Sequence, residues 1–511
     1  MNTFVQNMEN FGNRTFTQNG CVTLKSSLNA NVDMFAMASA MRRRPEGALE
    51  LFTKAWEEDA NLAVRNLFYL RDVRGGQGER NIFRLCSCWM ADNQSNETFE
   101  EFISYIPEYG RWDDVIYILS YMHLSKDVRM IYTGKVNAIL DLLRNQFNTD
   151  MKAHMEGKPI SLLAKWYPLV NNTRNADAKK VAKFLANALF GTEKDARKVV
   201  VGLRTYMKVL EQKLSNNEWN EVDYSTVPSC ANKKYSKAFW KHDGERYGNF
   251  IEKVNKGEAK MNSSALYPYD IVYQVGKDNR MSSTEWDAMW KNLPDYTNGK
   301  SAICVVDVSG SMGSFGHSYW GDNGVQPIHV ALSLGLYFAQ RNKGDFQNRF
   351  FTFSGRPQIV GVKGNNLKEI LNNMSRADWG GSTNIEAVFD LYLKLAKQSK
   401  PEDLPESIII ISDMEFNQCQ YPNYRLTTFE NIQRKFEAAG IKRPNLIFWN
   451  ANSSGHNVPV RFDESGTVLV SGCSPSSFAY VMEGKTPIDF MLDVLNGKRY
   501  ANINVFKREE K

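Results

Sequence analysis

The hydrophobic pattern of this 511-residue chain changes once, close to residue 298. From about residue 30 to residue 295, apolar residues recur at helical spacing in segments separated by Gly, Pro or Asn turns. Beyond that point, short apolar β-branched runs such as 303–306 and 408–411 alternate with segments of helix length. The pattern predicts an α + α/β protein with an extended arm (1–28), an α-helical domain (29–298) and a doubly wound α/β domain (299–511).

The helical domain has many helix-length segments, among them 48–70, 136–146 and 194–214. Many helices without strands favour either a bundle or a solenoid of packed helix pairs, such as HEAT-like repeats. No clean internal repeat is visible, so any repeats in this domain must be degenerate.

The α/β domain carries a candidate metal site at the ends of its predicted strands. The first strand runs into Asp307, Ser309 and Ser311, a later strand ends at Asp413, and Thr383 precedes a helical segment. Carboxylate and hydroxyl oxygens suit Mg²⁺, and Mn²⁺ could replace it. An open coordination position would accept an acidic residue of a protein partner. The alternative is an ordinary strand-to-helix turn with serine caps.

A glycine-rich segment, 313–326, follows the first metal-binding turn and contains Tyr319 and Trp320. It is either a lip over the metal or a surface loop with a buried aromatic anchor.

Charge and composition limit the classes of function. The net charge of +6 is spread over both halves, so any nucleic-acid site must be a local patch. There is no signal-like apolar segment at the N-terminus and no run of about 18 apolar residues, so we expect no membrane association and a cytoplasmic protein. The seven scattered cysteines fit a reducing compartment. With no nucleophile–base pair or phosphate-binding loop, we expect no enzymatic activity.

Three basic segments of the helical domain are candidate RNA-binding surfaces. The first has Arg71, Arg74 and Arg80 in a glycine-rich turn; its structural alternative is a tight turn whose arginines pair with Asp72 and Glu79. The second has Lys179 and Lys180 on a helix, which could be a solvated helix face. The third has Lys233, Lys234, Lys237 and Lys241 among aromatic residues, and could be an amphipathic helix that packs Phe239 and Trp240 into the core.

Several motifs resemble those of TROVE proteins, the Ro autoantigen family, and especially a TROVE-related branch from plants, fungi, bacteria and large viruses. They are RDVRGGQGER (71–80), YGRWDD (109–114), CVVDVSGSM (304–312), WGGSTNIEAVFD (379–390) and ISDMEF (411–416). The resemblance implies a helical ring that binds small structured RNAs or RNA ends, closed by a von Willebrand A-like domain. The five candidate ligands resemble the metal-ion-dependent adhesion site of such domains.

Two further functions stay open. The chain could be a metal-dependent protein scaffold or chaperone adaptor that binds no RNA. It could also be a structural component of a virion or another assembly.

Overall fold

The computed structural model describes most of the chain. The described residues are 12–125, 132–172, 175–208, 210–263, 265–277, 283–297, 299, 301–313, 324–375, 382–417, 426–453, 455, 457–481 and 484–506.

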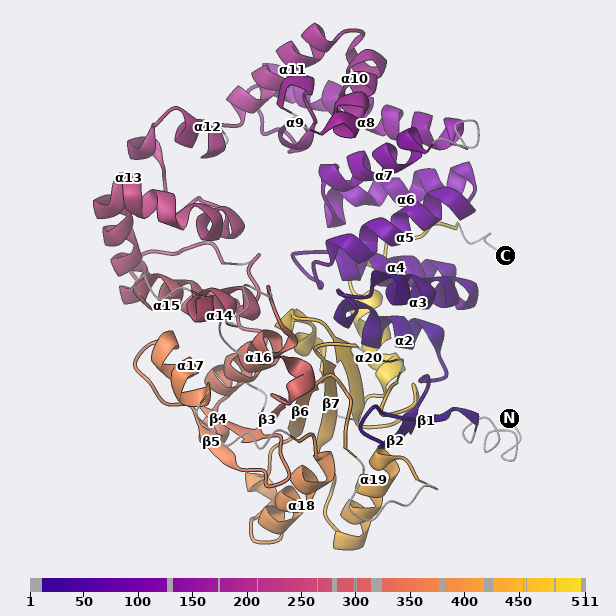
Figure 1. Cartoon of the computed structure of the whole chain (residues 1–511), viewed down its shortest axis with the longest axis vertical. Coiled ribbons are helices and arrows are strands. Elements are labelled where there is room, and N and C mark those ends of the chain that lie inside the picture. The colour runs from indigo at the N-terminus through magenta and orange to yellow at the C-terminus, as the bar shows by residue number, and fades with distance from the viewer. Residues whose placement is uncertain are drawn as a thin grey trace.

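The N-terminal part is an arc of α-helices in which successive helices pack against one another (Figure 1). This confirms the expected helical part, whereas its HEAT-like repeat character stays a prediction. The helices are α2 (Ala30–Met37), α3 (Pro45–Glu58), α4 (Ala60–Arg71), α5 (Arg80–Asn93), α6 (Asn96–Tyr109), α7 (Trp112–Leu124), α8 (Thr133–Met155), α9 (Leu163–Trp166), α10 (Ala176–Phe190), α11 (Glu193–Tyr206), α12 (Leu210–Ser215), α13 (Ser229–Lys256), α14 (Pro268–Lys277) and α15 (Ser283–Lys291).

The segment 48–70, which the pattern presents as one helix, is divided between α3 and α4. Asp59 has an extended backbone (φ −153°, ψ 101°), and its side chain accepts a hydrogen bond from the Leu62 N–H. Aspartate is a favourable N-cap, so this residue ends one helix and begins the next.

The C-terminal part is a six-stranded mixed sheet with helices, as expected for an α/β domain. The strand order is β5-β4-β3-β6-β7-β8; β5 is antiparallel to β4, and all other pairs are parallel. The strands are β3 (Ala302–Val306), β4 (Arg349–Thr352), β5 (Ile359–Gly361), β6 (Ser407–Ser412), β7 (Asn445–Asn450) and β8 (Thr467–Ser471). The helices are α16 (Pro327–Arg341), α17 (Leu367–Ser375), α18 (Ile385–Ala396), α19 (Thr428–Ala439) and α20 (Pro487–Leu495).

The chain direction across this sheet reverses at β3. From β3 the chain moves outward through β4 and β5, then crosses back to β6 and continues outward through β7 and β8. In parallel sheets, the carboxyl ends of two strands at such a reversal flank a crevice, which is where ligands bind. The fold therefore directs attention to the loops after β3 and β6.

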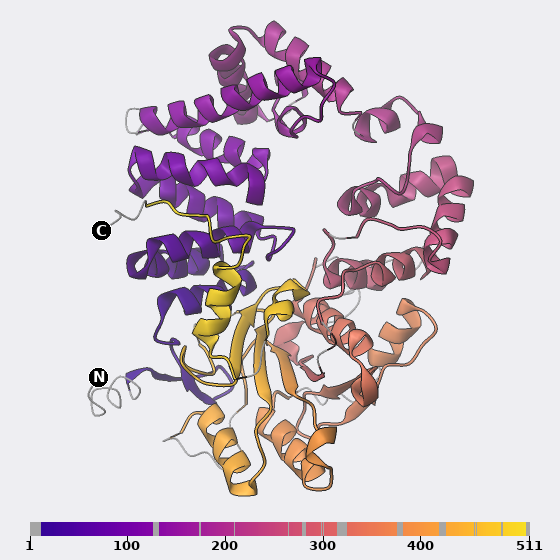
Figure 2. The same ribbon diagram turned by 180° about the vertical axis from the view of Figure 1, so that it is seen from behind.

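Both ends of the helical arc contact the α/β domain, so the molecule is a closed ring (Figures 1 and 2). At one end, α2 packs on β8, and both α2 and α4 pack on α20. At the other end, α14 packs on α16 and α17, and α15 packs on α17.

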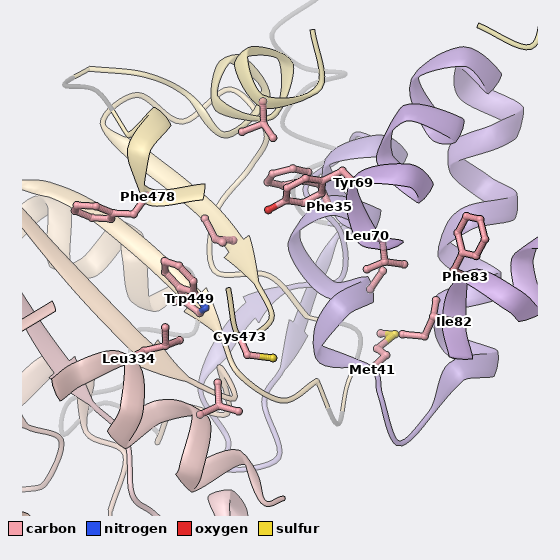
Figure 3. Packing of buried hydrophobic residues seen from close by; sticks show 14 of the residues in the cluster. Phe35, Met41, Tyr69, Leu70, Ile82, Phe83, Leu334, Trp449, Cys473 and Phe478 are labelled. Carbon is pink, nitrogen blue, oxygen red and sulfur yellow. The ribbon is translucent and has the colours of Figure 1, made fainter. Parts of the chain in front are cut away.

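Aromatic residues fill the first of these contacts. The ring of Phe35 on α2 stacks on Tyr69 of α4 at 5.0 Å and meets Phe490 of α20 edge-on at 5.9 Å. Figure 3 shows this packing between the helices and the strands, with Trp449 of β7 and Cys473 nearby. Because these side chains are buried, the two parts of the chain share one hydrophobic core.

Each described end of the chain packs on the opposite part of the molecule. Strands β1 (Arg14–Phe16) and β2 (Val22–Leu24) form an antiparallel hairpin within the expected arm, and β2 bridges to Val458 in the α/β domain. At the other end, the Ile503 carbonyl accepts a hydrogen bond from Arg65 of α4 at 2.9 Å. The two domains are thus interlocked.

Among the described residues, no helix combines the length and hydropathy that a membrane span requires.

Candidate functional site

The candidate metal site lies at the reversal of the sheet. Asp307 directly follows β3, and Asp413 directly follows β6; their exposed fractions are 0% and 2%. The Asp307 backbone N–H donates to the Ile411 carbonyl at 2.9 Å, which holds the two strand ends side by side. Two distant segments therefore bring two buried carboxylates to one place.

The two carboxylates are unequally satisfied. Asp307 accepts hydrogen bonds from the Ser309 N–H at 2.9 Å and the Ser412 hydroxyl at 2.6 Å. Asp413 accepts one from the Glu415 N–H through Oδ1 at 3.1 Å, but its buried Oδ2 has no hydrogen-bond partner among the described residues. Burial, and then the charge of Asp413, raise the pKa of Asp307 to about 6. A buried unpartnered oxygen beside a second carboxylate fits a bound cation.

The predicted hydroxyl ligands differ in their placement. The hydroxyls of Ser309 and Ser311 lie 3.0 Å apart in the turn after β3. The hydroxyl of Thr383 instead contacts the Glu415 carbonyl at 2.9 Å and the Asn417 side chain at 2.8 Å. The structure therefore joins Thr383 to the loop after β6 rather than to the carboxylates themselves.

These residues fit a hard cation that is bound mainly by hydroxyls and two acids. Within the described ranges, no group of three or more His, Cys, Asp or Glu side chains could hold a metal. The proposed lip residues Tyr319 and Trp320 lie outside the described residues.

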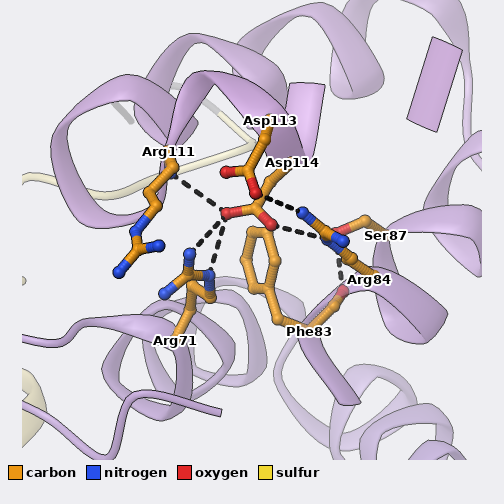
Figure 4. A network of polar contacts seen from close by, with 7 residues as sticks. All are labelled: Arg71, Phe83, Arg84, Ser87, Arg111, Asp113 and Asp114. Carbon is orange, nitrogen blue, oxygen red and sulfur yellow. Dashed lines mark hydrogen bonds and ion pairs between the residues drawn. The ribbon is translucent and has the colours of Figure 1, made fainter. Parts of the chain in front are cut away.

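Arg71, a candidate RNA contact, is instead buried inside the helical domain with an exposed fraction of 1%. Its guanidinium donates to Oδ2 of Asp114 through Nε at 2.9 Å and Nη2 at 2.7 Å (Figure 4). Asp114 also accepts from Arg84 Nε at 2.7 Å and from the Arg111 backbone N–H at 3.0 Å. The prediction for Arg71 is wrong, because its charge is used to satisfy a buried carboxylate on a neighbouring helix.

The acidic residues of the same glycine-rich turn hold other parts of the chain. Asp72 binds Arg499 and accepts a hydrogen bond from the Tyr500 hydroxyl at 2.9 Å, and Glu79 binds Arg42. The segment is therefore a structural turn, as the alternative stated. However, Asp72 and Glu79 pair with arginines from other parts of the chain rather than with the arginines of the turn.

Position 76 in this turn requires glycine for a steric reason. A Cβ at this position would lie 1.8 Å from the Tyr69 carbonyl oxygen, so only glycine fits so close to the backbone of α4.

Arg74 and Arg80, the other candidates in this turn, are exposed. Arg80 is joined by Arg111, which reasoning from the sequence missed although it lies within the YGRWDD motif. Burial, and then the charge of Arg111, lower the pKa of Arg80. Neither guanidinium forms an ion pair with a carboxylate among the described residues, and that of Arg111 lies 5.4 Å from the centre of the Trp166 ring.

Helix α13, on the other side of the ring, carries a cation and also a thiol that interacts with Arg80 and Arg111. Partial burial and then Asp270 raise the pKa of the Cys230 thiol at the start of α13, whereas the charges of Arg111, Lys233 and Arg80 oppose this. Three cations from two limbs thus act on one exposed thiol. We refer to Arg80, Arg111 and Lys233 as the cation cluster.

The remaining basic candidates are mostly at the surface. Phe239 is fully buried, as the alternative stated, whereas Trp240 is 36% exposed although its indole N–H donates to Glu285 at 3.0 Å. The alternative therefore holds for Phe239 only. Lys233 pairs with Asp270, Lys180 pairs with Asp177, Lys234 stacks on Tyr235, and Lys179, Lys237 and Lys241 are exposed.

Comparison with known proteins assigns the chain to a family. A model described as a domain of unknown function, DUF2828, matches residues 17–99 and 117–296. The chain belongs to the DUF2828 family. A second domain of unknown function, DUF7788, matches residues 301–501. The DUF2828 match covers the hairpin turn and the helical arc, whereas the DUF7788 match covers the sheet and the candidate metal site.

Individual proteins are also similar to this DUF2828 chain. "Uncharacterized protein L728" of Acanthamoeba polyphaga mimivirus is 30% identical over 512 residues, covering 94% of this chain and 87% of that protein. Among solved structures, the RO (RSR) protein of Deinococcus radiodurans matches with a TM-score of 0.43 and 14% identity, over 88% of this chain and 94% of that one.

Proposed function

We propose that this chain is a non-enzymatic RNA-binding protein with a metal-dependent protein-binding site. Its helical arc would engage single-stranded or structured RNA, and its α/β domain, as a von Willebrand A-like module, would bind Mg²⁺ or Mn²⁺. The RNA part of this proposal is supported by Arg80 and Arg111, which form no ion pair with a carboxylate among the described residues, and by Trp166 beside Arg111.

The cation cluster is suited to a phosphate group. Like charges held close together repel each other, and an anion between them removes that cost. Neither arginine of the cluster has a carboxylate partner among the described residues, so both guanidinium groups are available for a phosphate. Trp166 beneath Arg111 adds an aromatic face to which a base can stack. Phosphate contacts together with a stacking surface are typical of single-stranded nucleic-acid binding.

The metal part of the proposal rests on the orphaned Oδ2 of Asp413. Asp307, Asp413, Ser309 and Ser311 would hold the cation, and Thr383 would complete the set directly or through water. When bound, the cation would offer an open position to a carboxylate of a protein partner. In this proposal all five side chains would serve as ligands, and the role proposed for the site is binding rather than catalysis.

The RNA proposal is tested with Arg80→Ala combined with Arg111→Ala, measured against a labelled oligo-uridine and a stem-loop RNA. Affinity should fall for both probes, and the slope of log K against log salt should decrease by about 0.7 to 0.9 for each phosphate that the variant no longer neutralises. Arg349→Ala, which removes an exposed arginine from β4, is the matched control and should change neither. An unchanged affinity and slope in the double variant would exclude the cation cluster. A wild-type protein that binds neither RNA would favour the metal-dependent scaffold.

A further inference from the structure

The loop after β6 faces two partners at once. On one side, Asp413 lies beside Asp307 in the candidate metal site. On the other side, residues 415–417 contact the turn of the N-terminal hairpin, residues 17–20, which we refer to as the hairpin tip. A segment of five residues, 413–417, therefore separates the candidate metal from a part of the chain about 400 residues earlier.

The hairpin tip is held by directed hydrogen bonds. The Thr17 hydroxyl donates to the Phe416 carbonyl at 2.7 Å, and the Gln18 N–H donates to the Glu415 carboxylate at 2.6 Å. Gly20 pairs with Asn417 in an antiparallel bridge. These contacts hold the backbone of residues 415–417 against the hairpin tip.

Glu415 is the central residue of this contact. Its exposed fraction is 2%, and its carboxylate also accepts a hydrogen bond from the Asn457 amide at 2.9 Å. A buried carboxylate is costly unless its oxygens accept hydrogen bonds. The docked hairpin tip supplies one of the donors that the Glu415 carboxylate needs, the Gln18 N–H.

Asn19 connects the hairpin tip to a predicted metal ligand. Its amide donates to the Glu415 carbonyl at 2.6 Å and lies 3.4 Å from the Thr383 hydroxyl. The same carbonyl accepts the Thr383 hydroxyl at 2.9 Å. Asn19 and Thr383 thus share one acceptor, and moving the hairpin tip would change the position of both the carbonyl and the hydroxyl.

We infer that divalent-metal binding and docking of the hairpin tip are coupled through residues 413–417, with Asn19 as a positioning residue. This inference rests on the metal site of the proposed function. A docked tip holds the loop in one geometry before the metal arrives, so less ordering is needed on binding. By thermodynamic reciprocity, a bound metal stabilises the docked tip by the same factor.

The test measures Mn²⁺ affinity of the full-length protein by calorimetry. Asn19→Ala should weaken Mn²⁺ binding about fivefold or more, the lower end of typical coupling between sites. Asn19 is exposed, so this variant should fold normally, which a thermal unfolding curve checks. Arg14→Ala is the matched control, because Arg14 lies in the same hairpin but contacts Glu430 at 3.6 Å rather than the metal loop. Its Mn²⁺ affinity should equal that of the wild type.

A second variant separates positioning from direct ligation. Asn19→Asp removes the amide donor and places a negative charge beside the Glu415 carbonyl, so it should also weaken Mn²⁺ binding. Tighter Mn²⁺ binding by this variant would make residue 19 a ligand and overturn the positioning role.

The reciprocal measurement is hydrogen exchange at residues 17–24. Addition of Mn²⁺ should slow exchange there in the wild type and in Arg14→Ala, but not in Asp413→Asn. The coupling is refuted if the wild type binds Mn²⁺, Asn19→Ala binds it with the same affinity, and Mn²⁺ does not change hydrogen exchange at the tip. In that case the metal site itself would still stand. If the wild type binds no Mn²⁺, the metal site itself fails, and the coupling fails with it.

Discussion

The buried carboxylate of Asp114 should be one of the most sensitive positions of the helical arc. It is fully buried and accepts four hydrogen bonds, from Arg71 Nε and Nη2, Arg84 Nε and the Arg111 backbone N–H, at 2.7 to 3.0 Å. Asp114→Ala leaves the guanidinium of Arg71, itself 1% exposed, without a counter-charge. Breaking a buried pair in this way costs about 3 to 5 kcal/mol.

The neighbouring residue provides a matched control. Asp113 is partly exposed and forms an ion pair with Arg84 at 2.9 Å. Arg84 keeps its ion pair with Asp114 when Asp113 is removed, and the Asp113 side chain is 20% exposed, so Asp113→Ala should cost less than Asp114→Ala.

The free energies are best compared by native-state hydrogen exchange of α5 and α7, because a protein with two interlocked parts need not unfold in one step. A cost for Asp114→Ala within about 1 kcal/mol of that for Asp113→Ala would refute the burial argument. A drop in RNA affinity in Arg71→Ala at unchanged stability would restore Arg71 as a direct RNA contact.

Two further outcomes are expected. Mg²⁺ should raise the melting temperature of the wild type but not that of Asp413→Asn, since a ligand that binds only the folded state stabilises it; an equal rise in both proteins would place the bound metal elsewhere. Gly76→Ala should lower the melting temperature, because the new methyl group would collide with the Tyr69 carbonyl at 1.8 Å and displace the turn; a melting temperature equal to that of the wild type would contradict this.

Prediction from the sequence worked where the signal is local. The runs at 303–306 and 408–411 are continuous and β-branched, and both are fully buried central strands. Because the carboxyl ends of parallel strands share one edge, the pairing of Asp307 with Asp413 followed from their positions. The short strand β5 was missed, since three residues at an exposed edge carry little hydrophobic pattern.

The sequence failed where a charge depends on a distant partner. In the sequence, Arg71 resembles a phosphate ligand in a glycine-rich turn. In the fold, its guanidinium is buried and donates to Asp114, 43 residues later. Asp72 meets Arg499 across 427 residues of sequence. A local pattern reports that a charge is present, whereas only the tertiary fold decides whether water, a ligand or another side chain compensates it.

The packing of each described end of the chain on the opposite part of the molecule has a consequence for synthesis of the protein. The hairpin at the start of the chain contacts residues that are translated about 400 positions later. At about 5 to 20 residues per second, these partners follow the hairpin by about 20 to 80 s.

An isolated two-stranded hairpin is marginally stable in water, so the nascent hairpin should stay open during that interval. Arg65 of α4 must likewise wait for its hydrogen-bond partners at residues 496–504 until that segment has been translated. A ribosome that stalls near the boundary between the two parts would therefore release a helical arc that lacks both its anchors.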